Sequence, residues 1–125
     1  MLPRRHRLTE RADFTATVRG SRRRGSPFVV VHARSATKPG GRAPVRVGLV
    51  VSRAVGDAVT RNRVARRLRH QVAPLLPLLP AGTDLVLRAT PAAADARSDQ
   101  LAEALRHCLR DLLAQTPGPA TGASS

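Results

Sequence analysis

Arginine is the residue type with the clearest chemical potential in this sequence, and it is concentrated in one short stretch. Five arginines, one asparagine and one histidine stand between Arg61 and His70, and no acidic residue lies between Thr60 and Gln71. Guanidinium groups are planar forks that fit phosphate oxygens two at a time. A solvated charged face would interleave Glu or Asp three or four residues away. Like charges at this density repel unless a polyanion neutralises them, so the stretch indicates a phosphate-rich partner.

The positions of these arginines predict a helix with two different faces. At about 100° per residue, one arc gathers the apolar residues Ala58, Val64, Ala65, Leu68 and Val72. The opposite half presents Asn62, Arg63, Arg66, Arg67, Arg69 and His70. Arg61 falls on the apolar side in the first turn, where its long stem can carry the charge out to solvent. We expect Asp57 to cap this helix and the apolar arc to pack on a sheet.

No group of residues has the spacing of a metal site or of a protein catalytic centre. The four histidines and Cys108 show no metal-ligand spacing, and Cys108 stands at an apolar helix position, which predicts a core thiol. The eight acidic residues are scattered, whereas two-metal phosphodiester cleavage needs clustered carboxylates. The sequence also lacks the G-x-x-x-x-G-K-[ST] phosphate loop. We therefore expect no catalytic residue and no metal ligand in the chain.

The composition predicts one strongly basic domain. The chain has 125 residues, of which 42% are hydrophobic, and a formal net charge of +14, which suits one core and a polyanionic partner. It has no long apolar segment and no basic helix with aromatic anchors, so nucleic acid is favoured over membrane. Two phenylalanines are its only aromatic residues, which argues against a base-stacking platform. A single cysteine and the absence of a secretory signal predict a cytoplasmic location.

The remaining segments are the elements that must position the arginine helix. We expect a basic arm over residues 1–8, a single RNA-binding domain over residues 9–113 and a disordered tail over residues 114–125. Within the domain, Thr9–Gly20 reads as a helix and Ser21–Gly25 as a basic loop, either an RNA contact or a solvated turn. The last helix is predicted from apolar residues at a 3.6 period, namely Leu101, Ala104, Leu105, Cys108, Leu109 and Leu112.

Three apolar, β-branched runs predict strands. They are Phe28–Ala33, Arg46–Ser52 and Asp84–Ala89. We expect the second strand to lie antiparallel to the first, across the Gly- and Pro-containing loop of residues 35–44. The arginine helix follows the second strand and must end by about Pro74, because proline cannot continue it.

With these residues identified, the chain resembles the protein subunit of bacterial ribonuclease P. The motif that carries the resemblance is Arg61-Asn62-Arg63 within Gly56–Arg69, preceded by Arg46–Ser52 at the family's spacing. Leu8–Phe14, Phe28–Val31 and Asp84–Arg88 also match, so the likeness covers about residues 7–113. It implies an α/β (α+β) two-layer sandwich with three helices on a four-stranded mixed sheet, the fourth strand lying near Ser21–Ser26. It also implies a left-handed β-α-β crossover through the arginine helix, against the general right-handed rule.

The same resemblance implies a function. In the family the catalyst is an RNA subunit, which uses Mg²⁺ held mainly by RNA and substrate phosphates to remove the 5′ leader of precursor tRNA. The implied partners are that RNA and precursor tRNA, with no membrane and no obligate protein partner. The implied RNA-binding residues are Arg53, Arg61, Asn62, Arg63, Arg66, Arg67 and Arg69. The implied 5′-leader cleft is lined by Phe14, Val18, Val29 and Val31.

The sequence departs from the family pattern at three of its positions. Valine stands at Val18 and Val31, where aromatic residues are common, which weakens a stacking role in leader binding. Asp57 stands where asparagine is usual, which keeps the helix cap but adds a negative charge near the RNA face. Two rival functions stay open at this point, a ribosomal protein and a protein-only nuclease. The missing carboxylate cluster argues against the nuclease, and the RNA that co-purifies with the protein separates the other two.

Overall fold

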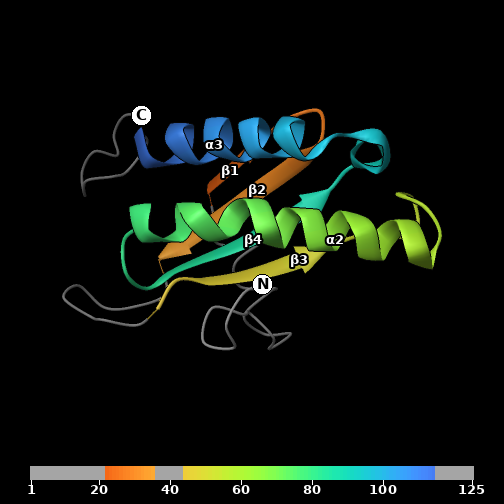
Figure 1. Ribbon diagram of the computed structural model, residues 1–125. Coiled ribbons are helices and arrows are strands. Elements are labelled where there is room, and N and C mark those ends of the chain that lie inside the picture. Colours follow the sequence, from red (N-terminus) through yellow and green to blue (C-terminus); the bar gives the residue numbers. More distant parts are fainter. Residues whose placement is uncertain (1–21, 36–43, 115–125) are drawn as a thin grey trace.

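A computed structural model describes residues 22–35 and 44–114 of the chain (Figure 1). Its strands are β1 (Arg22–Gly25), β2 (Val29–Ser35), β3 (Arg46–Val50) and β4 (Thr83–Ala89). Its helices are α2 (Ala58–Val72), the 3₁₀ segments η2 (Ala73–Leu78) and η3 (Pro91–Asp95), and α3 (Ser98–Ala114). The helix expected over Thr9–Gly20, the basic arm and most of the expected tail lie outside the described residues.

The four strands form one mixed sheet in the order β1-β2-β4-β3. Strand β4 pairs antiparallel with β2, with Val31 opposite Leu87, and parallel with β3, with Val47 opposite Leu85. Strand β3 therefore runs antiparallel to β2, the first predicted strand, as expected, but the two are not neighbours because β4 lies between them. Helix α2 carries the chain back along the sheet between β3 and β4, so these two strands run parallel, and β4 occupies the place beside β2. The handedness of this crossover stays a prediction.

The fourth strand of the sheet is β1, which pairs antiparallel with β2. This confirms the strand expected near Ser21–Ser26, and it corrects the reading of the basic Ser21–Gly25 cluster as a loop. Alternate residues of a strand point to opposite faces, so Arg22 and Arg24 share the face of Ala33 and Val31, their register partners. Both arginines reach α3 on that face, where Arg24 pairs with Asp111 at 2.8 Å and Arg22 donates to the Leu112 carbonyl at 3.1 Å.

The core lies between one face of the sheet and the two described α-helices, which lie side by side in Figure 1. The sheet contributes Val29, Val31, Ala33, Val47, Leu85, Leu87 and Ala89 to this core. The helices contribute buried side chains at helical spacing: Val64, Leu68 and Val72 from α2, and Leu101, Leu105, Cys108, Leu109 and Leu112 from α3. Together they form an α+β two-layer arrangement. Burial raises the pKa of the Cys108 thiol, as expected for a core cysteine.

The ends of α2 are set by local chemistry. The Asp57 carboxylate accepts from the Thr60 backbone N–H at 2.8 Å, which confirms the predicted cap. Gly56, just before the cap, has φ +157°, and a Cβ there would come within 2.8 Å of the Thr60 side chain. The helix ends at Val72, before Pro74, and continues as η2. None of the helices in the described part of the chain is long and apolar enough to cross a membrane.

Candidate nucleic-acid interface

Helix α2 separates its apolar and polar side chains much as the helical wheel predicted. Val64, Leu68 and Val72 are fully buried under the helix. Four polar residues of the opposite half are exposed: Asn62, Arg66, Arg69 and His70. Ala65 is half-buried and Ala58 is exposed at the first turn. We call Asn62, Arg66, Arg69 and His70 the exposed face of α2; it carries two arginines and no acid.

Two arginines of the predicted RNA set are instead engaged with the protein. Arg63 donates from Nη2 to the Ala94 carbonyl at 3.2 Å, and Arg67 donates from Nη1 to the Ala96 carbonyl at 2.9 Å. Both side chains are half-buried, and their acceptors lie in and just after η3. No local sequence pattern indicates these contacts, because they join residues 31 and 29 positions apart.

The remaining predicted RNA contacts lie at the amino-terminal end of α2. Arg53 is exposed in the turn that connects β3 to the helix. Arg61 is half-buried, and its Nε is buried without a hydrogen-bond partner among the described residues. The pKa of the exposed Asp57 is lowered first by its hydrogen bonds with Thr60, and to a lesser extent by the charges of Arg63 and Arg61. The cap therefore stays ionised, and it offsets part of the positive charge at this end.

Two of the four residues predicted to line the leader cleft are buried in the structure. Val29 and Val31 are fully buried in the core under α3, so neither side chain offers a surface to a ligand. Phe14 and Val18 lie outside the described residues. A signal for this burial was present in the sequence, because the polar residues His32 and Arg34 alternate with the valines, and polar residues along one strand face point away from a core.

The opposite sheet face, which we call the outer face, carries Arg23, Val30, His32 and Arg88. Arg23 is opposite His32 on the neighbouring strand, and Arg88 is opposite Val30. Both arginines are exposed, whereas His32 is buried. The pKa of His32 is lowered, first by burial and then by the charges of Arg88 and Arg23, so the imidazole is neutral near pH 7. The positive charge of this part of the outer face is thus supplied by the arginines.

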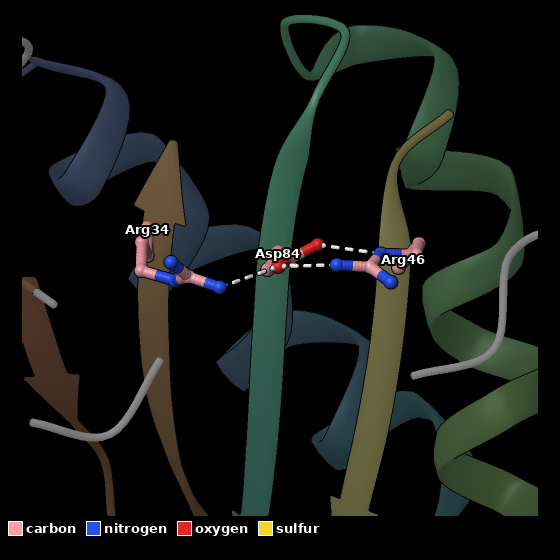
Figure 2. Close-up of polar contacts among 3 residues, drawn as sticks. All are labelled: Arg34, Arg46 and Asp84. Carbon is pink, nitrogen blue, oxygen red and sulfur yellow. Dashed lines mark hydrogen bonds and ion pairs between the residues drawn. The ribbon is translucent and has the colours of Figure 1, made fainter. Parts of the chain in front are cut away.

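One acid is buried at the end of the same outer face (Figure 2). Asp84 in β4 is almost completely buried, and both of its oxygens accept from Arg46 in β3, each at 2.9 Å. Arg34 in β2 donates to the same carboxylate at 3.1 Å. The cluster joins three adjacent strands through side chains and holds one more positive than negative charge. Sequence reasoning missed it, because Arg46 and Asp84 were read only as residues of separate strands and Arg34 lies just beyond the predicted strand Phe28–Ala33.

The described residues offer little to a metal ion. Within residues 22–35 and 44–114, no group of three or more His, Cys, Asp or Glu side chains is arranged to hold one. The Asp84 carboxylate is already bound by two guanidinium groups. What this surface can do chemically is bind anions through Arg53, Arg66, Arg69, Arg23 and Arg88.

Comparison with known proteins gives one consistent result. The model of the Ribonuclease P family matches residues 2–113. The chain is 50% identical over 118 residues to the ribonuclease P protein component of Streptomyces avermitilis, covering 90% of this chain and 96% of that protein. It is 48% identical over 120 residues to the protein of the same name from Mycobacterium avium, covering 95% and 100%.

Solved structures show the same arrangement of elements. The RNase P protein from Thermotoga maritima superposes with a TM-score of 0.67 at 25% identity, covering 90% of this chain and 98% of that one. The Staphylococcus aureus RNase P protein gives a TM-score of 0.71 at 24% identity, covering 85% and 94%. The likeness supports the four-stranded mixed sheet with helices that positions the arginines described above.

Proposed function

Because the chain belongs to the ribonuclease P protein family, we propose that it is the protein subunit of a ribonucleoprotein that removes the 5′ leader of precursor tRNA. In this proposal the RNA subunit is the catalyst and the protein binds and orients RNA in the cytoplasm. Mg²⁺ would be held mainly by the RNA and by substrate phosphates. The chemistry of the chain agrees, since its buried acid Asp84 is committed to two arginines and its exposed acids on α3 pair with arginines as well.

The exposed face of α2 is the observation that carries this proposal. A helix anchored by three buried apolar residues presents Asn62, Arg66, Arg69 and His70 to solvent without an acid among them. Arginine forks on a rigid helix suit the phosphates of a folded RNA. We assign the RNA subunit to this face together with Arg53, Arg61 and the unused N–H groups of Arg63 and Arg67.

We assign the 5′ leader to the outer face of the sheet. Arg23 and Arg88 would contact its phosphates, and Phe14 and Val18 of the expected first helix would contribute apolar contact. Val29 and Val31 are withdrawn from this set because they are buried in the core. On this assignment Arg88→Ala weakens binding of precursor tRNA while leaving binding of mature tRNA unchanged.

The dependence of binding on salt tests the α2 assignment. If the helix neutralises several phosphates, log affinity for the RNA subunit falls linearly with log salt, and removing one contact flattens the slope by about one unit. We expect this flattening for Arg66→Ala. The matched control is Arg110→Ala on α3, which is also an exposed helical arginine and should leave the slope unchanged. An unchanged slope for Arg66→Ala would show that this face does not contact RNA.

The identity of the bound RNA separates the proposal from the ribosomal alternative. Protein purified from its own cells should bring down one RNA species of a few hundred nucleotides, with precursor tRNA among its ligands. Recovery of ribosomal RNA alone would favour a ribosomal protein and would overturn the proposed function.

A further inference from the structure

Arg63 and Arg67 lie one helical turn apart on α2, and both contact the same short segment of the chain. Their acceptors are the carbonyls of Ala94 and Ala96, at 3.2 and 2.9 Å. This segment joins η3 to the start of α3, and its apolar residues Ala93 and Ala96 are 0% and 2% exposed. The two arginines therefore brace the η3–α3 junction against α2.

Each brace leaves much of its guanidinium group unused. A guanidinium carries N–H donors along more than one edge, and each of these side chains donates to one carbonyl among the described residues. Both residues are only half-buried, so part of each remains accessible to solvent. Between them in sequence stands Arg66, which is exposed and makes no hydrogen bond or ion pair with the described residues. A phosphate bound at this face would thus meet arginines that are already held in place.

A bound phosphate would also strengthen the brace. A guanidinium that contacts a phosphate on one edge and a carbonyl on another loses its freedom to swing away, so both contacts are more often made together than separately. Linkage requires the effect to be reciprocal. RNA that favours the braced conformation stabilises the junction, and a stable junction raises the affinity of the helix for RNA.

We propose that Arg63 and Arg67 are positioning residues that couple RNA binding on α2 to the stable packing of the η3–α3 junction against this helix. The inference rests on the proposed function, since it takes RNA as the ligand of α2. Arginine suits this coupling better than lysine would, because a compact ammonium on a flexible stem supplies the charge but not two separated edges.

Amide hydrogen exchange of the full chain, with and without RNA, measures this coupling. The reporters are three amides hydrogen-bonded within the junction: Ala93 to the Thr90 carbonyl at 2.9 Å, Ala96 to Ala93 at 3.2 Å and Leu101 to Arg97 at 3.0 Å. The probe is the ribonuclease P RNA of Streptomyces avermitilis, transcribed in vitro. We expect this RNA to raise the protection of these amides by on the order of 5-fold, the lower end of ordinary coupling between sites.

The deciding variants are Arg67→Lys and, separately, Arg63→Lys, with Arg66→Lys as the matched control. Each keeps the positive charge, so RNA should still bind with the same salt slope, but loss of the coupling should lower the affinity of Arg67→Lys and Arg63→Lys by about 5-fold at most. In Arg67→Lys and Arg63→Lys we expect the protection gained with RNA to fall toward 1-fold, whereas Arg66→Lys should keep the wild-type gain. A purely structural role would speed exchange equally with and without RNA and leave the gain unchanged.

The outcomes separate the two proposals. RNA binding without added protection in the wild-type junction, or with protection that persists in both Arg67→Lys and Arg63→Lys, would overturn the coupling and leave the RNA-binding assignment standing. Failure of the wild-type protein to bind the RNA at all would overturn both.

Discussion

Asparagine at position 84 would remove the only negative charge from the cluster that joins β2, β4 and β3 (Figure 2). The side chain keeps its size, so the packing of the strand is preserved. An amide has one oxygen to offer, and its NH₂ group would face a guanidinium, so donors would oppose donors. Asp84→Asn therefore isolates the electrostatic contribution of the buried carboxylate to the free energy of unfolding.

The expected loss can be worked from the exposure of the three side chains. Removing one partner of a buried ion pair costs roughly 3–5 kcal/mol. Asp84 is 1% exposed, but the side chains of Arg34 and Arg46 are 25% and 31% exposed, so water can partly resolvate the two charges. We therefore expect a loss near the lower end, about 3 kcal/mol. In a domain of this size that lowers the melting temperature by roughly 12 °C or more.

Urea and thermal unfolding followed by far-UV circular dichroism measure this loss. The control is Asp99→Asn, which makes the same chemical change in a pair with Arg97 whose side chains are 74% and 72% exposed. Exposed pairs of this kind contribute little, so the control should unfold like the wild type. A loss for Asp84→Asn below about 1 kcal/mol, or one no larger than that of the control, would refute the view that this cluster stabilises the sheet.

Three further results are expected. Val31→Ala should lower the free energy of unfolding by about 2 kcal/mol without changing the affinity for a leader-bearing substrate, and a leader-specific loss of affinity would restore Val31 to the cleft. Asp57→Ala should lower the melting temperature at neutral pH; because the pKa of Asp57 lies below its ordinary value of 3.8, the cap is fully present above that value and is lost as pH falls through the lowered pKa. The difference from wild type should thus shrink in acid, and a constant difference would contradict the ionised cap. Protein purified free of RNA should cleave no precursor tRNA at any Mg²⁺ concentration, and specific 5′ maturation by such protein would refute catalysis by the RNA subunit.

Helix α2 could be predicted from the sequence because its structure depends on near neighbours. The 3.6-residue period placed Val64, Leu68 and Val72 in the core, and both the Asp57 cap and the end before Pro74 depend on contacts within one turn. The resemblance in the arginine motif indicated the family, which the comparisons then showed.

Tertiary structure alone decided the order of the strands and the partners of several charged residues. Strand β4 enters between β2 and β3 from a later part of the chain, and no local pattern specifies that place. Whether Val29 and Val31 are buried or exposed depended on which side of the sheet the helices cover. The polar residues that alternate with them did indicate that the two valines face the core.

The division of labour among the arginines is the clearest case of this limit. The sequence determined that α2 carries five arginines without an acid, and hence that the helix suits a polyanion. Folding then brought the carbonyls of Ala94 and Ala96 to Arg63 and Arg67 while leaving Arg66 in solvent. The sequence pattern sets the charge of a helix face, because charge is a property of each residue. Which guanidinium groups remain free for RNA depends on the segments that pack beside the helix, and these arrive from distant parts of the chain.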